Sequence, residues 1–354
     1  MTSPGATPIE ALLIRRIAAS GPVTLADYMS ECLLHPEFGY YTTREPFGSK
    51  GDFTTAPEIS QMFGELLGLC LAQTWLDQGA PAAFTLAELG PGRGTLMADV
   101  LRATRTVPGF HAAARVVLVE ASPRLCALQR ATLGAHPVQW LVSVEALPDA
   151  PLYLLANEFF DALPIRQFTR HAKGWAETTV GLVNNRLALG LAAPLPLAAL
   201  AHRLADTAPG DVVEICPAAP ALIAAITRRI SGRGGAALIV DYGGWRSRGD
   251  TFQALRAHAP VHPLDSPGAA DLTAHVDFEA LAGPHPHAYT TQGHLLENLG
   301  LRARSARLAG SLSGTALQSH LSATRRLTDP QEMGELFKAL ALFPRHFPPP
   351  PGFV

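Results

Sequence analysis

The sequence is poor in cysteine, in lysine and in charge of either sign. Its four cysteines, in 354 residues, form no CxxC or Cys/His arrangement, so neither a disulfide framework nor a zinc site is predicted. Charged residues make up 16 % of the chain and the formal net charge is −2. This balance, with no run of like charge, argues against broad electrostatic binding to nucleic acid. No apolar run approaches the roughly 18–20 residues that a membrane helix needs.

The first residues, MTSPGATPIEALLIRRIAASG, also lack the basic stretch ahead of an apolar segment that a secretory signal has. Their apolar spacing instead fits an ordinary amphipathic helix. Together these absences predict a cytoplasmic protein with no membrane insertion and no nucleic-acid partner. The oligomeric state is left open.

The predicted secondary structure changes near residue 84. Before it, helices are predicted over 8–20, 24–34 and 56–79, with a loop rich in Gly, Tyr and Thr between the last two. After it, strands and helices alternate, in the rhythm of a parallel, doubly wound α/β sheet. The predicted strands are FTLAEL, RVVLVEA, VQWLVS and LYLLANEF, with GTLMADVLRAT and SPRLCALQRATL as helices.

An interruption follows at about residue 165. Alternating polar and apolar residues around Asn184–Asn185 predict antiparallel strands joined by a turn. The αβ pattern is expected to resume with DVVEICP, a helix and the strand GGAALIVDYGG, and the chain to end in helices and a proline-rich strap. We therefore predict N-terminal helices with a site-covering loop over 1–80, and one α/β domain over 81–354 with insertions at about 165–210 and 245–285.

A glycine loop joins the first strand of this domain to its helix. The loop holds Gly90, Pro91, Gly92 and Gly94, and Glu120 ends the next strand. Glycines there let a ligand approach a helix N-terminus, and an acid at the second strand tip can accept ribose hydroxyls. The plainer alternative is that the glycines only shape a turn and Glu120 is a solvated charge.

An acid, Glu88, stands directly before this loop, and the pattern G-x-G-x-G is one residue shorter than the dinucleotide fingerprint. A carboxylate there would repel a pyrophosphate but suits the ammonium and sulfonium groups of S-adenosyl-L-methionine. The sequence thus favours this cofactor, and a methyltransferase, over a nicotinamide-dependent oxidoreductase.

A second polar cluster, Asn157, Glu158 and Asp161, follows the fourth predicted parallel strand. Two carboxylates suit a guanidinium, whose planar fork of donors they meet bidentately. They would hold its charge toward two nitrogens and leave the third more nucleophilic, with Asn157 orienting cofactor or substrate. Asp161 could equally be a helix cap, and Glu158 could cap a turn.

Taken together, the motifs resemble the MidA-like family of S-adenosylmethionine-dependent methyltransferases, which includes an arginine methyltransferase of respiratory complex I assembly. The segments that carry this resemblance are HPEFGYYTT, GSKGDFTTAPEISQMFGELLG, ELGPGRGTLM, VEASPRL, NEFFDALPIRQF, VEICPAAPAL, LIVDYG, PGAADLTAHVDF, TTQGHLLENLGL and MGELFKALAL. The resemblance implies a seven-stranded Rossmann-like sheet with an N-terminal helical region and an inserted antiparallel β segment. It also implies methylation of a protein arginine, with a complex I (NADH dehydrogenase) subunit as partner.

The resemblance further implies a loop that covers the site. Its candidate residues are Gly39, Tyr40, Tyr41, Asp52, Phe53, Thr54 and Thr55. Tyr40 and Tyr41 could instead simply pack the loop onto the core. Asp241 and Tyr242 could reach the pocket rim, and Asp271, His275 and Asp277 could face the substrate; their spacing fits no common metal site. Two further hypotheses stay open: a non-catalytic S-adenosylmethionine-binding assembly factor, and an N-methyltransferase acting on another protein or a small molecule.

Overall fold

The computed structural model describes residues 7–43 and 54–353, and the contacts within it divide the chain into two units. Unit 1 comprises Met1–Phe53, Asp161–Ala219 and Gly244–Asp277. Unit 2 comprises Thr54–Phe160, Pro220–Gly243 and Phe278–Val354. The division into parts 1–80 and 81–354 that was expected from the sequence stays a prediction. Among the described residues no helix has both the length and the apolar character to cross a membrane.

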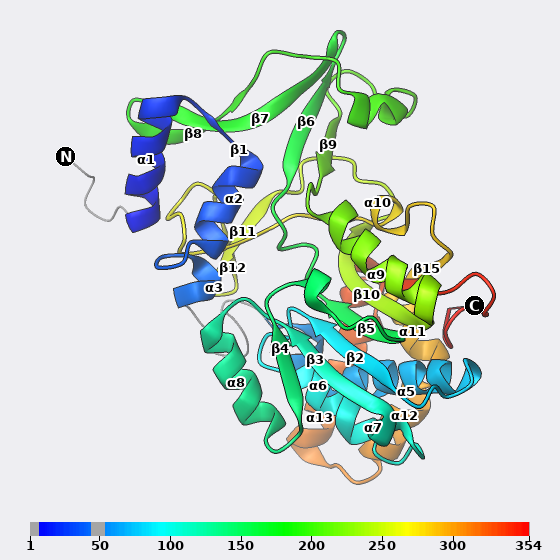
Figure 1. Ribbon diagram of the computed structural model, residues 1–354. Helices are drawn as coiled ribbons and strands as arrows, with labels where there is room; N and C mark the ends of the chain where they lie inside the picture. The colour runs from blue at the N-terminus through cyan, green and yellow to red at the C-terminus, as the bar shows by residue number, and fades with distance from the viewer. Residues whose placement is uncertain (1–6, 44–53, 354) are drawn as a thin grey trace. The chain divides into compact units, whose positions relative to one another are not determined.

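Unit 2 is built on a mixed β-sheet whose strands lie in the order β15-β16-β10-β5-β2-β3-β4 (Figure 1). The strands are β2 (Phe84–Leu89), β3 (Ala114–Val119), β4 (Val138–Leu141), β5 (Leu152–Asn157), β10 (Gly235–Gly244), β15 (His287–Thr291) and β16 (Phe337–Leu342). The five strands from β10 to β4 run parallel, and β16 runs antiparallel to β10 and β15. A short eighth strand, β14 (Val276–Asp277), also pairs with β10, so the described residues form eight strands in this sheet, against the seven expected.

The apolar runs of the sequence become the central strands because these strands are buried on both faces. Every residue of β2 and β5 is buried, as is usual for a parallel sheet covered by helices. The longer helices of the unit are α5 (Gln61–Asp77), α6 (Thr95–Thr104), α8 (Pro123–Leu133), α9 (Ala219–Arg233), α11 (Gln292–Asn298), α12 (Leu301–Ala309) and α13 (Gly314–Thr328). Helices α5 and α6 pack closely because Gly68 lies where a Cβ would come within 2.9 Å of Val100 Cα.

Two local expectations for this unit are wrong. The single helix expected over 56–79 is divided into α4 (Ala56–Ile59) and α5, because Ser60 is extended and its hydroxyl accepts a hydrogen bond from the Met62 N–H. The C-terminal region expected to be helical also contains β15 and β16. Residues 337–342 form a strand since their backbone pairs with both β10 and β15.

The proline-rich tail is packed on unit 2, in agreement with its interpretation as a strap. Phe353 is buried in the main apolar cluster of the unit. The Cys70 thiol of α5 donates to the carbonyl of Pro351, and the Asn298 amide of α11 donates to the carbonyl of Gly352. The segment thus contributes to the core, and its prolines reduce the conformational entropy that ordering it costs.

Unit 1 contains helices and two antiparallel sheets. The helices are α1 (Pro8–Ser20), α2 (Leu25–Leu34) and α3 (Tyr40–Thr43). The larger sheet has β1 (Val23–Thr24), β7 (Gly174–Val183), β6 (Arg166–His171) and β9 (Val212–Ile215) in this order, with β8 (Arg186–Leu191) also paired to β7. The smaller sheet has β11 (Gln253–Arg256), β12 (Ala259–Val261) and β13 (Asp271–Thr273). Their apolar side chains meet those of α1 and α2 in one core cluster.

The turn expected at Asn184–Asn185 is present between β7 and β8. Both residues have positive φ, 51° and 58°, the conformation that a two-residue hairpin requires and that asparagine tolerates. The return of the parallel pattern expected at residue 211 is wrong. Strand β9 pairs antiparallel with β6, Arg166 facing Ile215, so the αβ pattern resumes only at α9.

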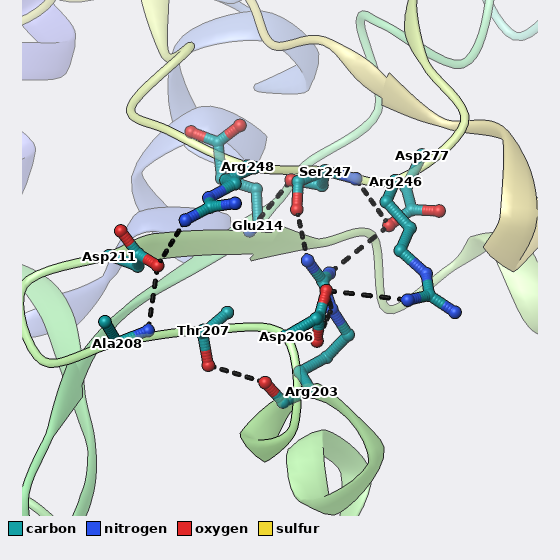
Figure 2. Close-up of polar contacts among 10 residues, drawn as sticks. All are labelled: Arg203, Asp206, Thr207, Ala208, Asp211, Glu214, Arg246, Ser247, Arg248 and Asp277. Carbon is teal, nitrogen blue, oxygen red and sulfur yellow. Dashed lines mark hydrogen bonds and ion pairs between the residues drawn. The ribbon is translucent and has the colours of Figure 1, made fainter.

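A buried arginine holds the loop after β10 inside unit 1 (Figure 2). Arg203 lies in the 3₁₀ helix η2 (Ala198–Leu204) and is 2 % exposed. Its Nε donates to the Asp206 carboxylate at 3.1 Å, and its Nη2 donates to the carbonyl of Ser247 at 2.7 Å. The Ser247 N–H in turn donates to Asp277, which lies 3.8 Å from Arg203 Nη1. Asp277, considered above as a substrate contact, therefore takes part in the internal bonding of this unit.

Replacing Arg203 is expected to destabilise the protein strongly. Arg203→Leu leaves a buried carbonyl and two carboxylates without their cation, and should lower the free energy of unfolding by about 3 kcal/mol. The matched control is Arg248→Leu in the same unit, whose guanidinium is mostly exposed and pairs with Asp211; it should cost about 0.5 kcal/mol. Urea unfolding followed by circular dichroism measures both. Equal losses would contradict the assignment.

Candidate active site

The parallel register of unit 2 brings the polar strand ends to one edge of the sheet. Leu89, the last residue of β2, pairs with Val119 on one side and with Ala156 on the other. Glu120 follows Val119 directly, and Asn157 follows Ala156. The glycine loop, Glu120 and Asn157 therefore leave the sheet at the same edge, which is where ligands bind in open α/β sheets.

The glycine loop has a backbone that suits ligand binding. Gly90, Gly92 and Gly94 all have positive φ, and Gly94 caps α6 after a tight turn in which its N–H donates to Pro91 O at 2.7 Å. At Gly90 a Cβ would lie 2.7 Å from the ring of Phe159, so no larger residue fits without displacing that ring. The loop thus presents bare backbone at the start of a helix.

Glu88 is a buried carboxylate beside this loop. It is 3 % exposed, and burial raises its pKa to about 8, with the charge of Glu120 adding to the shift and a hydrogen bond from the Met97 N–H opposing it. Its Oε2 accepts no hydrogen bond from any described residue. A carboxylate in this environment gains most from a cationic partner.

A second buried acceptor without a donor lies on the neighbouring strand. Asn157, the last residue of β5, donates its amide Nδ2 to Glu158 at 3.1 Å, while its Oδ1 meets no donor in the described parts of the chain. A positively charged group with several N–H donors would satisfy both this oxygen and Glu88. The residues present therefore fit the amino-acid end of S-adenosyl-L-methionine.

Glu120 is held in place by two hydrogen bonds. Its Oε1 accepts from the Ser122 N–H at 2.8 Å and its Oε2 accepts from Gln129 Nε2 at 3.1 Å. Burial raises the pKa of Glu120, and these two bonds oppose that shift. Each oxygen keeps acceptor capacity for a further donor, as a pair of ribose hydroxyls requires.

Glu158 occupies a strained position at the end of β5. Its φ is +49°, a left-handed conformation that costs a residue with a side chain on the order of 1 kcal/mol. Its Oε1 accepts hydrogen bonds from the Ala56 N–H at 3.0 Å and from Asn157, and its own N–H donates to Val240 O. Strain of this kind, over-determined by surrounding bonds, is found mainly at functional sites.

Asp241 fixes the turn that follows Glu158. Asp241 is completely buried in β10, one residue beyond the last pair with β5, and its Oδ2 accepts from the N–H groups of Phe159 at 3.1 Å and Phe160 at 2.9 Å. Its Oδ1 accepts from the Tyr242 N–H. Asp241 thus acts through the backbone of the turn, a role that its position at a strand end did not reveal.

Of the predicted covering loop, Thr54 and Thr55 lie in unit 2 directly before α4, whereas its candidates Asp52 and Phe53 lie outside the described residues. Besides the Ala56 bond to Glu158, Glu58 of α4 accepts from the Thr95 hydroxyl at 2.6 Å. Glu58 also lies 3.6 Å from Arg93 in the glycine loop. Helix α4 therefore bridges the glycine loop and the end of β5. Glu58 was missed because nothing in its local pattern marks it.

The remaining candidates lie in unit 1. Gly39 precedes α3, and Tyr40 is completely buried in the apolar cluster of the unit, which is the packing role left open above. The Tyr41 hydroxyl donates to Asp271 at 2.8 Å, and burial with the charges of Asp271 and Asp161 raises the Tyr41 pKa. Asp161 is buried, and its pairing with Glu158 around a guanidinium stays a prediction. Among the described residues no cluster of His, Cys, Asp or Glu could hold a metal.

The comparisons with known proteins agree with this geometry. Residues 66–294 match the model of a family described as S-adenosyl-L-methionine-dependent methyltransferases. The chain belongs to this family. The resemblance of the motifs to S-adenosylmethionine-dependent methyltransferases is thereby confirmed, and with it the enzyme class and S-adenosyl-L-methionine as cofactor; the narrower name MidA-like stays a prediction.

Named relatives extend over almost the whole chain. The protein arginine methyltransferase NDUFAF7, mitochondrial, of Bos taurus is 37 % identical, covering 96 % of this chain and 84 % of the relative. The same protein of Homo sapiens is 36 % identical with the same coverage. A Burkholderia thailandensis protein crystallised with S-adenosyl-homocysteine has a TM-score of 0.82 at 29 % identity, covering 100 % of this chain and 96 % of that one. This neighbour confirms the α/β methyltransferase fold.

The comparisons contradict the cytoplasmic location. The bovine and human relatives, and a Drosophila melanogaster homolog at 34 % identity, are named as mitochondrial proteins. The expectation rested on composition and on the lack of membrane segments. These properties describe the folded domain and do not report the compartment.

Replacing Glu88 should change the way in which the stability of the cofactor-free protein depends on pH. Because its folded pKa of about 8 lies above the unfolded value of 4.5, the folded state binds more protons between these values, so stability falls as the pH rises from about 4.5 to 8. The glutamine of Glu88→Gln does not ionise. At pH 8, without cofactor, the free energy of unfolding of this variant should therefore exceed that of the wild type by about 1 kcal/mol or more, whereas at pH 5 it should not.

Thermal melting of the cofactor-free proteins at both pH values checks this expectation. Glu145→Gln, at an exposed position, is the control and should change neither melting temperature. If Glu88→Gln were destabilised equally at pH 5 and pH 8, the carboxyl would not be protonated by burial.

Proposed function

We propose that the protein transfers a methyl group from S-adenosyl-L-methionine to an arginine side chain of a protein, with a subunit of respiratory complex I as the expected substrate. The observation that carries the proposal is the strained, partly buried Glu158, held at the sheet edge between the cofactor loop and α4. The names of the bovine and human relatives support arginine as the target.

The residues proposed to bind the cofactor offer different chemical groups to its different parts. Glu88 and Asn157 offer buried acceptors to the ammonium end, the glycine loop offers bare backbone, and Glu120 offers a carboxylate to the ribose diol. When bound, S-adenosyl-L-methionine supplies an electrophilic methyl group on a sulfonium. A positive ligand also favours the ionised form of Glu88, because a nearby cation lowers the pKa of a buried carboxyl.

Glu158 is assigned to the substrate. Its Oε1 is directed by two donors, so the carboxylate is held in one orientation and can accept the parallel N–H groups of a guanidinium. Drawing the positive charge toward the bound nitrogens leaves the free nitrogen more nucleophilic, and fixed placement supplies much of the rate. Asp161 is the candidate second carboxylate. Lysine, a point charge without the fork, would fit this arrangement poorly.

The finer features of the fold belong to the same proposal. We assign the antiparallel sheet of unit 1, with β6 to β9, to the segment inserted in this family, and the loop through Thr54 and Thr55 to the site cover. Both segments add surface outside the parallel sheet. A large substrate such as a protein would need this additional contact surface.

Glu158→Gln is expected to abolish methyl transfer while cofactor binding persists. The amide keeps the size and the acceptor oxygen but loses the negative charge, so the rate should fall by about 100-fold or more. The assay incubates the enzyme and methyl-labelled S-adenosyl-L-methionine with purified complex I subunits, and mass spectrometry locates the modified residue. The matched control is Glu145→Gln, which should keep full activity.

Calorimetric titration of Glu158→Gln with S-adenosyl-homocysteine separates the alternatives. Unchanged affinity with lost transfer supports the proposal. Full activity in Glu158→Gln would refute the role of Glu158, and label on lysine or on a small molecule would refute the substrate class. A wild-type protein that binds cofactor but methylates nothing in complex I extracts would be a binding factor.

A further inference from the structure

Gln129 is a buried polar residue on a helix that otherwise turns apolar side chains inward. It lies in α8, where Leu125, Cys126 and Leu133 are the other buried residues, and it is 0 % exposed. Its backbone passes close to the glycine loop, because a Cβ on Gly94 would lie 3.4 Å from Gln129 Cα. A buried amide costs free energy unless it is hydrogen-bonded, and a leucine here would suffice for packing alone.

The three hydrogen bonds of Gln129 fix its orientation. Trp140 Nε1 donates to Gln129 Oε1 at 2.8 Å, and an indole N–H can only donate, so the amide oxygen must face Trp140. The Nε2 group then points the other way, and it donates to Gly92 O at 2.9 Å and to Glu120 Oε2 at 3.1 Å. Both of its N–H groups are used, one for each acceptor.

The indole that sets this orientation is itself braced. The guanidinium of Arg130 lies over the Trp140 ring, 4.4 Å from its centroid, at a distance typical of a cation–π contact. Trp140 also belongs to β4, whose backbone pairs with β3 directly before Glu120. Strand, indole and amide therefore form one continuous support behind the carboxylate.

We propose that Gln129 is a positioning residue of the cofactor site, which sets the Glu120 carboxylate at a fixed place relative to the glycine loop so that it meets the ribose hydroxyls. The inference rests on the proposed role of Glu120 in cofactor binding and goes beyond it, because it assigns Gln129 a role that acts through Glu120. With Gln129 and Ser122 each occupying one acceptor site, both carboxylate oxygens remain open to a diol. The Gly92 bond ties the same amide to the loop that receives the rest of the nucleoside.

The variant that tests this role is Gln129→Met, which keeps the length and the volume but removes both donors. It should weaken S-adenosyl-homocysteine binding about tenfold, the effect of one charge-assisted hydrogen bond. At saturating cofactor kcat should be unchanged and only KM for S-adenosyl-L-methionine should rise. Gln139→Met, an exposed glutamine on β4, is the matched control and should bind as the wild type.

A double-mutant cycle with Glu120→Ala distinguishes positioning from plain packing. If Gln129 acts through Glu120, Gln129→Met should change the affinity less than twofold in the Glu120→Ala background. An equal tenfold loss in both backgrounds would overturn the proposal, as would wild-type affinity in a folded Gln129→Met. If Glu120→Ala alone bound normally, the cofactor role of Glu120 would fail instead.

Trp140→Phe provides the test should Gln129→Met not fold. This variant leaves Gln129 in place but removes the donor that orients its amide, so the side chain can rotate. Affinity for S-adenosyl-homocysteine should fall about threefold, roughly 0.6 kcal/mol, and only when Glu120 is present. An undiminished affinity in the folded Trp140→Phe protein would contradict the proposal.

Discussion

Parallel pairing of three neighbouring strands, two of them buried along their whole length, determines where chemistry can occur in this molecule. Because β2 is hydrogen-bonded to β3 on one side and to β5 on the other, its end, the end of β3 and the end of β5 are aligned within one residue. Burying polar side chains within such strands costs free energy, so most of the polar groups of the site lie where the strands stop, and Glu88 is one residue from the end of β2. The glycine loop, Glu120 and the pair Asn157–Glu158 then share one edge although they come from three separate parts of the sequence.

Assembling acids at a buried edge opposes stability until a cation arrives. Glu88 lies beside the charge of Glu120, and its second oxygen has no donor in the described chain. The same features disfavour an anionic ligand: a pyrophosphate at Gly90 would lie beside the Glu88 carboxylate, which is why the nicotinamide alternative fits poorly. Charge, more than the glycine pattern, selects the cofactor class here.

Much of this organisation could be predicted from the sequence, since strands such as FTLAEL and LYLLAN are mostly apolar and helix α1 begins at a recognisable Thr7 cap. What could not be predicted depends on partners distant in the chain. Ser60 could extend a helix or cap one, and residues 337–342 become a strand only through β10 and β15. Likewise Asp241, which fixes the turn after Glu158, lies 83 positions beyond Glu158, and Gln129, which bonds to Glu120, lies nine positions beyond Glu120.

The interleaving of the two units has a consequence for biosynthesis. The chain passes between them five times, and each unit is complete only when its third segment is present. During translation β10 is made about a hundred residues before its antiparallel partner β16. The edge of β10 that pairs with β16 therefore stays unpaired while the later segments are made. Exposed strand edges of this kind are where non-native association begins. Until β16 has been made, this edge of β10 is therefore open to association with other chains.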